Sequence, residues 1–298
     1  MVAARNDASM TRENRIEAKA AGILYVVATP IGNPADVTLR ALETLREADL
    51  IICEDTRRTG MLLSAHQIKV PMLSNFEHNE ARRLPEIMSK LESGARLALV
   101  TDAGTPGISD PGFRLVRAAR EAGIEVNAVP GACAAIAALS IAGLPTDRFT
   151  FEGFLPAREA ARIKALEVLR TEPRTMVFYE APRRLREALA DMAQILGGRR
   201  EAAVVREITK THEETIRATL SDLAEHFRKQ DALGEITIVV EGASELERVA
   251  SHQSGVTVQA LVEAGMSIKD ASTVIARLTG ASRREIYQQA IRNRSETE

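Results

Sequence analysis

Short apolar runs alternate with amphipathic segments from Ile23 onwards, and this alternation constrains the fold more than any other feature of the chain. Strands separated by helices form βαβ units around a largely parallel sheet. We therefore predict an N-terminal α/β domain over residues 22–145. Its expected strands are Ile23 to Thr29, Leu50 to Glu54, Arg96 to Thr101 and Ile124 to Val129, and its expected helices are 36–48, 57–66, 79–92, 111–122 and 132–142.

The pattern restarts after Gly143-Leu144-Pro145 and then changes. Strand, helix, strand and helix are expected at 149–154, 157–170, 175–179 and 183–196. The runs Glu201 to Ile208, Glu214 to Thr219 and Glu235 to Val240 are strand-like, with little helix between the first two. Such runs favour antiparallel pairing in a mixed sheet. We expect a second, mixed α/β domain over residues 146–243, and a length of 298 residues suits two domains and a small extra piece.

The two ends of the chain differ from these domains. Residues 1–21 are polar and of mixed charge, which is typical of a flexible tail and not of a secretion signal. Residues 251–298 predict a small helical domain with helices at 259–263, 268–278 and 284–291, broken at Gly265 and Gly280, with Ser267 and Ser282 as N-caps. This spacing is typical of a helix-turn-helix, but also of small three-helix appendages that bind no nucleic acid.

Composition limits the classes of partner. The chain is 45% hydrophobic and 27% charged, and no apolar run approaches the ~20 residues that span a bilayer, so we expect no membrane association. With a net charge of −2, binding to nucleic acid requires local basic surface, for which four arginine pairs are available: 57–58, 82–83, 183–184 and 199–200. Cys53 and Cys133 show no metal-ligand spacing, which predicts reduced thiols, no metal site and a cytoplasmic location.

The segment Val100 to Gly112, VTDAGTPGISDPG, directly follows an expected strand. Its glycines let backbone groups approach a ligand, its prolines fix turns, and Pro111 suits the first turn of the next helix. Open α/β sheets bind ligands at the carboxyl ends of their strands, so this loop is a candidate ligand site. An ordinary connection is the alternative, because the same residues are common in turns.

Three more loops follow expected strands: Ala28 to Pro34, Glu54 to Arg58 and Val129 to Ala132. All four loops should open at the same edge of a parallel sheet and line a cleft against the second domain. They contain neither G-x-G-x-x-G nor G-x-x-x-x-G-K-[ST], which argues against dinucleotide and P-loop sites.

Six motifs in order resemble one known family. They are ATPIGN (28–33), EDTR (54–57), TDAGTPGISDPG (101–112), FEGFLP (151–156), YEAPR (179–183) and REITKTHEE (206–214). From Leu24 to Gly242 the chain is similar to the tetrapyrrole methylase-like, class III S-adenosylmethionine-dependent methyltransferases, in particular to members that methylate ribosomal RNA. The resemblance implies two α/β domains with a cofactor cleft between them and a small C-terminal helical appendage.

The resemblance also implies an activity and partners: transfer of the methyl group of S-adenosyl-L-methionine to the 2'-hydroxyl of a cytidine ribose in the decoding region of 16S ribosomal RNA, within the 30S subunit, by a homodimer. Carried over by motif, the residues near the cofactor are Thr29, Pro30, Gly32, Asp102, Ala103, Gly104, Thr105, Ala132, Cys133, Tyr179, Ala181, Pro182, Gly234 and Glu235. Backbone groups of the Asp102 to Thr105 loop approach its methionine part, and the residues from Tyr179 onwards face its adenosine.

Three residues of these motifs are candidates for the chemistry. We hypothesise that Asp55 and Lys210 position or deprotonate the hydroxyl, and that Arg57 binds an RNA phosphate. Each has a structural alternative: Asp55 precedes a helical run and suits an N-cap, and Lys210 and His212 could be solvated residues at a strand end.

Two other functions remain open. A tetrapyrrole methyltransferase of the same fold would need an aromatic-lined cavity for a large ring, whereas this chain has 3 Tyr, 7 Phe and no Trp, and arginines in its cleft motifs favour a phosphate-bearing substrate. A ligand-sensing DNA-binding regulator would need a basic tail. Glu285, Gln288 and Gln289 intersperse the tail arginines, so the tail is only mildly basic.

Overall fold

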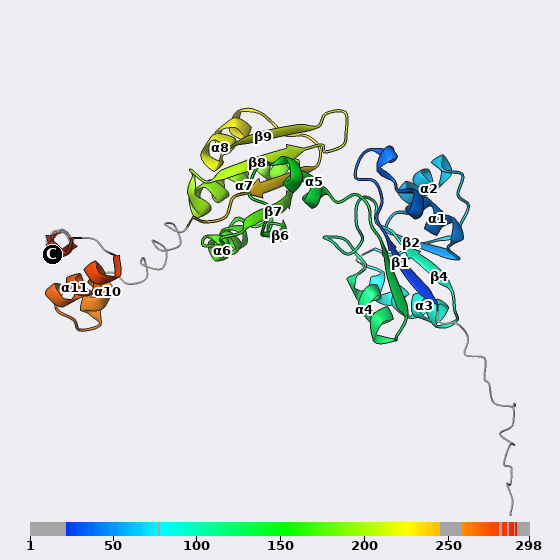
Figure 1. Cartoon of the computed structure of the whole chain (residues 1–298), viewed down its shortest axis with the longest axis horizontal. Helices are drawn as coiled ribbons and strands as arrows, with labels where there is room; N and C mark the ends of the chain where they lie inside the picture. The colour runs from blue at the N-terminus through cyan, green and yellow to red at the C-terminus, as the bar shows by residue number, and fades with distance from the viewer. Residues whose placement is uncertain are drawn as a thin grey trace, which may run out of the picture. The chain divides into compact units, whose positions relative to one another are not determined.

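The computed structural model describes residues 22–76, 78–244, 258–279, 282–284, 286–288 and 290 (Figure 1). These residues divide into two compact units, which are described one at a time. The first contains residues 22–137 together with Glu207–Glu213, and the second contains residues 138–206 and those from Glu214 onwards. The predicted domain boundaries remain predictions. The predicted tail over 1–21 and the predicted break at Gly280 lie outside the described residues.

The first unit contains a wholly parallel sheet in the order β3-β2-β4-β1-β5. Its strands are β1 (Ile23–Val27), β2 (Leu50–Cys53), β3 (Met72–Ser74), β4 (Arg96–Leu99) and β5 (Glu125–Val129). The predicted parallel α/β sheet is confirmed. Strand β3 was not predicted, because three half-buried residues leave no periodic signal. The helices are η1 (Pro34–Asp36), α1 (Leu39–Glu47), α2 (Thr56–Ala65), α3 (Glu80–Glu92), α4 (Phe113–Glu121) and α5 (Ala134–Ile141).

Helices cover both faces of this sheet, because successive strand side chains point to opposite faces. In β2, Ile51 and Cys53 pack with Leu45 of α1 and Leu63 of α2, whereas Ile52 packs with residues of α3 and α4. All strand residues in both clusters are almost fully buried. Burial on both faces is typical of parallel sheets, and it leaves the strand ends as the accessible parts of the sheet.

The second unit contains a mixed sheet in the order β6-β7-β10-β8-β9. Strands β6 (Phe149–Phe154) and β7 (Thr175–Glu180) pair in parallel; β8 (Glu201–Arg206), β9 (Glu214–Thr219) and β10 (Ile236–Val240) make the antiparallel pairs. The predicted mixed sheet is confirmed. Helices α6 (Glu159–Leu169), α7 (Pro182–Met192), η2 (Ala193–Gly197) and α8 (Leu220–Lys229) pack on one core with this sheet.

Two further helices are described after the second sheet, α10 (Val258–Glu263) and α11 (Ile268–Thr279). Ser267 caps α11, since its Oγ accepts a hydrogen bond from the N–H of Asp270 at 3.1 Å, as predicted. The third predicted helix, 284–291, lies partly outside the described residues. Among the residues that the structure describes, no helix has the length and apolar character needed to cross a membrane.

The start of α4 differs from the prediction. The helix begins at Phe113, after Gly112, and not at Pro111. Gly112 has φ +131°, and a Cβ there would lie 2.8 Å from Leu99 Cδ2. Its N–H donates a hydrogen bond of 3.2 Å to Oε1 of the buried Glu80. This backbone conformation excludes a helical residue at 112, so the helix starts at 113, two residues later than predicted.

We expect Gly112→Ala to destabilise the first unit by about 2–3 kcal/mol, because the new Cβ adds a clash with Leu99 to the strain of a positive φ. Gly123→Ala is the matched control: Gly123 has φ +70° with no atom within 4 Å of the added Cβ, so about 1 kcal/mol is expected. Urea unfolding of the full chain measures both. Equal losses in the two variants would contradict the packing argument.

Candidate ligand and catalytic site

The four predicted site loops leave the first sheet at one edge. They follow β1, β2, β4 and β5, and these strands are all parallel, so their carboxyl ends meet there. A fifth segment, Glu207–Glu213, also belongs to the first unit although it connects β8 to β9. Its membership of this unit was not predicted, because only tertiary contacts reveal it.

The loops after β1 and β4 are joined by backbone hydrogen bonds. Thr29 and Gly104 exchange N–H to O=C bonds of 2.9 and 3.1 Å in an isolated antiparallel bridge. Thr29 Oγ1 donates to the carbonyl of Thr101 at 3.1 Å, and Thr105 Oγ1 donates to the carbonyl of Ala132 at 3.3 Å. Predicted cofactor residues of three loops are therefore adjacent. Pro30, Gly32, Ala103 and Cys133 lie on the same loops.

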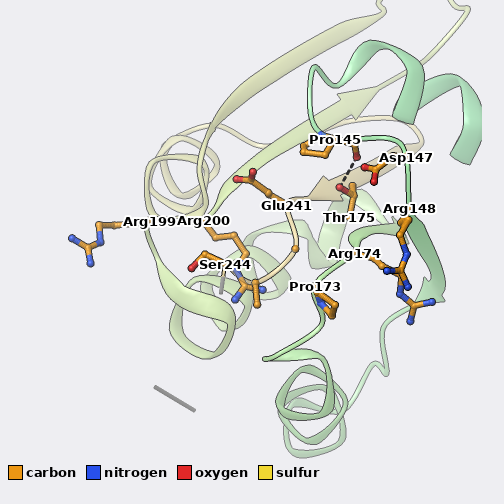
Figure 2. Close-up of a pocket in the computed structure, with 12 residues that line it drawn as sticks. Pro145, Asp147, Arg148, Pro173, Arg174, Thr175, Arg199, Arg200, Glu241 and Ser244 are labelled. Carbon is orange, nitrogen blue, oxygen red and sulfur yellow. Dashed lines mark hydrogen bonds between the residues drawn. The ribbon is translucent and has the colours of Figure 1, made fainter. Parts of the chain in front are cut away.

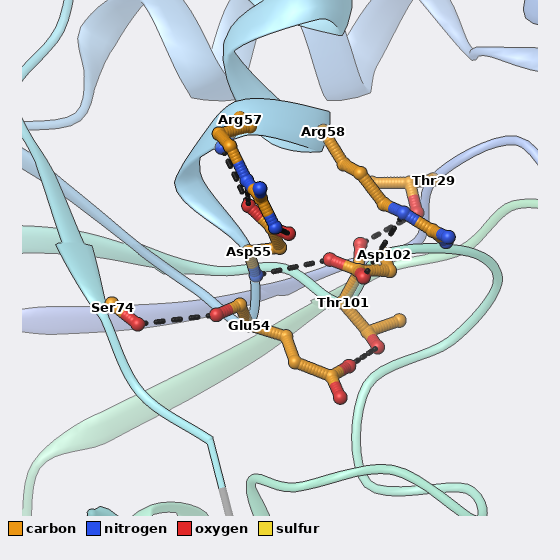
Figure 3. A network of polar contacts seen from close by, with 8 residues as sticks. All are labelled: Thr29, Glu54, Asp55, Arg57, Arg58, Ser74, Thr101 and Asp102. Atoms are coloured by element: carbon orange, nitrogen blue, oxygen red, sulfur yellow. Dashed lines mark hydrogen bonds and ion pairs between the residues drawn. The ribbon is translucent and has the colours of Figure 1, made fainter.

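Asp102 connects the β4 loop to the β2 loop (Figure 3). Its Oδ1 accepts a hydrogen bond of 3.0 Å from the N–H of Asp55, and its Oδ2 lies 3.6 Å from Nε of Arg58. Its side chain is only 20% exposed. The Asp102 carboxylate thus fixes the relative position of two loops, while the backbone N–H and C=O of Gly104 are used in the bridge to Thr29.

Asp55 is the N-cap of α2, as the structural alternative stated. Its Oδ1 accepts hydrogen bonds from the N–H of Arg57 at 2.8 Å and from Arg57 Nε at 3.1 Å, and Oδ2 accepts from Nη2 at 2.7 Å (Figure 3). The side-chain bonds from Arg57, together with its backbone N–H, lower the pKa of Asp55 to about 2. A carboxylate of such low pKa is a weak base at neutral pH.

Two further carboxyl groups, those of Glu54 and Asp110, lie near Thr101. The Thr101 hydroxyl donates to Glu54 Oε2 at 3.3 Å, and Ser74 Oγ donates to the Glu54 carbonyl at 3.2 Å (Figure 3). Burial raises the pKa of the nearby Asp110 to about 6. The negative charges of Glu54 and Asp102 raise this pKa further, and a hydrogen bond to Thr101 opposes the increase. Asp110 was not among the predicted site residues, because its burial depends on the folded loop.

Lys210 lies against the loop after β1. A Cβ built on Gly32 would lie 2.6 Å from Lys210 Cγ and 2.9 Å from Cε, so the glycine makes room for this side chain. Lys210 Nζ pairs with Glu207 Oε1 at 2.8 Å, and the lysine side chain is 28% exposed. Glu207 and Thr209 have positive φ values of 51° and 67°. Non-glycine residues in this region carry strain, which is often found at functional sites.

The remaining predicted residues lie together at one edge of the second sheet. Ile236 pairs with Glu180 at the end of the ladder; Gly234 and Glu235 directly precede Ile236, and Ala181 and Pro182 directly follow Glu180. Ala181 is the N-cap of α7 and Pro182 its first residue. The Tyr179 ring packs edge-on to Phe151, with centroids 4.9 Å apart. The sequence motifs therefore converge within each unit, and the predicted cleft between the units remains a prediction.

Within the described ranges, no cluster of three or more His, Cys, Asp or Glu residues is arranged to hold a metal ion. Cys53 and Cys133 are both free thiols, the first buried and the second partly buried. The polar groups at the site are thus backbone amides and carbonyls, hydroxyls, carboxylates, arginines and Lys210.

Comparison with known families agrees with this fold. The profile of the tetrapyrrole (corrin/porphyrin) methylases matches residues 23–224, and that of the RsmI C-terminal HTH domain matches 257–294. Among solved structures, the methyltransferase CobJ shares the fold with a TM-score of 0.58, 20% identity, and coverage of 75% of this chain and 95% of that one. Uroporphyrin-III C-methyl transferase from Thermus thermophilus, complexed with S-adenyl homocysteine, has a TM-score of 0.53 and 18% identity. The match covers 74% of this chain and 97% of that one. The chain belongs to the tetrapyrrole methylase family.

Within that family its relatives carry a more specific name. A protein of Synechocystis sp. called ribosomal RNA small subunit methyltransferase I is 46% identical over 90% of this chain and 96% of its own length. The protein of the same name from Escherichia coli O157:H7 is 44% identical over 91% of this chain and 95% of its own length. The one from Pseudomonas aeruginosa is 46% identical over 93% of this chain and 99% of its own length. The similarity thus covers more of the chain than the residues that form the two sheets.

The carboxyl of Asp110 makes stability depend on pH. Its pKa of about 6 in the folded chain exceeds the ordinary 3.8, so the folded state binds more protons between these values and stability falls as pH rises through that window. We expect Asp110→Asn to gain about 1 kcal/mol above pH 7, allowing for solvent screening of a half-exposed group, and nothing below pH 4. Denaturant unfolding at both pH values measures this. A pH-independent difference between variant and parent would contradict it.

Proposed function

We propose that this methyltransferase transfers the methyl group of S-adenosyl-L-methionine to the 2'-hydroxyl of a cytidine ribose in the decoding region of 16S ribosomal RNA. The observation that carries the proposal is the 44–46% identity, over about nine-tenths of the chain, to proteins named ribosomal RNA small subunit methyltransferase I. The family neighbour complexed with S-adenyl homocysteine supports the choice of cofactor. We further propose that the enzyme acts as a homodimer on the 30S subunit.

The proposed cofactor site uses the backbone of the joined loops. The bridge between Thr29 and Gly104 and the Asp102 hydrogen bond hold the Asp102 to Thr105 segment in one conformation. A preformed loop loses little conformational entropy when a ligand binds. The proposal places the methionine part of the cofactor at this loop and its adenosine at Tyr179, Ala181, Pro182, Gly234 and Glu235, where backbone donors and acceptors suit a neutral base and ribose.

The proposed roles of the three candidate catalytic residues follow from their contacts. Because its pKa is about 2, Asp55 acts by positioning Arg57 and not by taking a proton. The Arg57 side chain is 88% exposed and already oriented by Asp55, which suits it to an RNA phosphate. Lys210 lies over Gly32 beside the cofactor loop, and its ammonium group is proposed to orient the 2'-hydroxyl.

A tetrapyrrole substrate is the second candidate, because the solved structures of similar fold include tetrapyrrole methyltransferases. Those structures are under 25% identical and support the fold alone. Residues 257–294 match an HTH domain, so the proposal includes a contact between the C-terminal segment and nucleic acid. With relatives of much higher identity named for ribosomal RNA, we favour RNA as the substrate.

The substrate is tested by mapping ribose methylation on 16S RNA from cells with and without the gene. We expect one cytidine 2'-O-methyl group in the decoding region to disappear when the gene is deleted. Methylation of naked 16S RNA and of 30S subunits by the purified enzyme then compares the two substrates, with faster transfer to the 30S subunit expected. An unchanged methylation map would overturn the proposal.

The residue roles are tested by single substitutions in the same transfer assay. We expect Lys210→Ala to lower kcat at least about tenfold and Lys210→Arg to restore part of it, because positioning by a cation survives the conservative change. Arg57→Ala should mainly raise KM for RNA, and Asp55→Asn should do so more weakly. Full activity in all three of Lys210→Ala, Arg57→Ala and Asp55→Asn would refute the assignments.

A further inference from the structure

The second unit contains a cavity of about 640 Å³ outside the site described above (Figure 2). It lies at the edge of the second sheet where β6, β7 and β8 begin and β10 ends. Its walls are formed by residues at or next to these strand ends: Pro145, Asp147, Arg148, Pro173, Arg174, Thr175, Arg199, Arg200, Glu241, Gly242, Ala243 and Ser244.

This cavity and the proposed adenosine-facing residues lie at opposite ends of the same strands. In β7, Thr175 lines the cavity, whereas Tyr179 lies near the other end. β10 runs antiparallel to β7, so Val240 pairs with Met176 near the cavity and Ile236 pairs with Glu180 away from it. Strands of this length span roughly 15–20 Å at about 3.3 Å per residue. One small ligand cannot reach both ends, whereas an RNA chain can.

Arginines dominate the cavity walls. Four of the lining residues are arginines and two, Asp147 and Glu241, are acidic. Arg174 is paired with Glu172 through two bonds, Nε to Oε1 at 2.6 Å and Nη2 to Oε2 at 2.9 Å. Only 40% of its side chain is exposed, against 88% for the similarly paired Arg57, which reduces its availability for a ligand.

The other arginines differ in their surroundings. Arg200 is buried, and its Nη2 donates to the carbonyl of Arg170 at 3.1 Å. Arg148 and Arg199 are exposed, and neither forms an ion pair with any residue in the described part of the chain. In Figure 2 the Arg148 side chain lies beside that of Arg174, and the Arg199 side chain extends away from the ribbon on the other side. Exposed arginines at a concave surface can form bidentate bonds with phosphate oxygens.

We propose that Arg148 and Arg199, at the rim of this cavity, bind phosphate groups of the RNA substrate at a distance from the methylated ribose. The inference rests on the proposed function, since it assigns an additional contact to the same RNA. A chain of net charge −2 has to concentrate positive charge locally to bind a polyanion, and this cavity does so. The Asp147 and Glu241 carboxylates disfavour a compact multiply charged anion, but tolerate a backbone whose phosphates contact the arginine-bearing rim.

The test compares the double variant Arg148→Ala/Arg199→Ala with wild-type full-length enzyme. We expect RNA affinity, measured by fluorescence anisotropy with a labelled 16S RNA fragment, to fall about tenfold, and the slope of log K against log salt to shrink by about 1.4 for two lost contacts. KM for RNA should rise while kcat at saturating RNA and calorimetric affinity for S-adenosyl-L-methionine stay unchanged. Arg148→Lys/Arg199→Lys should retain most of the salt dependence.

The matched control is Arg117→Ala/Arg228→Ala, which removes the same charge from two exposed arginines already paired with Glu121 and Glu225. It should bind RNA as the wild type does. Equal RNA affinity and salt slope in the cavity variant and this control would overturn the inference and leave the proposed function intact. A wild-type enzyme that neither binds nor methylates ribosomal RNA would overturn the proposed function and this inference together.

Discussion

The exchange of two backbone hydrogen bonds between Thr29 and Gly104 is the interaction on which the candidate site depends. Both residues lie just beyond the carboxyl ends of neighbouring parallel strands, where the sheet ladder has stopped and the chain would otherwise be free to diverge. The bridge is antiparallel, so it does not extend the parallel ladder but joins the two loops to each other, and Gly104 meets its geometry with φ +87°. The glycine-rich loop is thereby a fixed surface, and the side chains of Thr101, Asp102 and Thr105 are positioned around it.

Two carboxylates of the site loops, Asp55 and Asp110, have opposite electrostatic environments. Asp55, at the start of α2, accepts hydrogen bonds that favour its charged form, and its pKa is about 2. Asp110 is half-buried near Glu54 and Asp102, and its pKa is about 6. The difference follows from hydrogen bonding in one case and desolvation in the other. At neutral pH the residue that orients Arg57 is therefore fully ionised, whereas the glycine-rich loop itself contains a carboxyl group that can be protonated.

The sequence predicted the elements whose signal is local. Strands β1, β2, β4 and β5 have apolar periodicity and their loops have dense glycine and proline, so the shared edge could be inferred from parallel connectivity alone. Features set by tertiary contacts were missed. β3 is too short to show a period, the start of α4 depends on a hydrogen bond from Gly112 to the buried Glu80, and the burial of Asp110 requires the folded loop. The packing of Lys210 on Gly32 joins residues far apart in sequence, and no local pattern encodes it.

The arginine pairs likewise show that the sequence alone does not tell which positive charges are available to a ligand. From sequence the four pairs were equivalent sources of basic surface, but the structure assigns most of them to intramolecular partners. Arg57 and Arg58 contact Asp55 and Asp102, Arg83 contacts Glu86, and Arg184 binds the buried Glu180 at 2.5 Å. An arginine paired with a buried carboxylate stabilises the fold and is not free to bind a ligand, because leaving that carboxylate unpaired would reduce the stability of the fold by several kcal/mol. Arg199 is exposed and forms no ion pair among the described residues. Arg148, which is not in an arginine pair, is also exposed, and its charge interacts with Glu172 without forming an ion pair. The basic surface available to a polyanion is therefore determined by which carboxylates the fold places beside each arginine, and not by the number of arginines in the sequence.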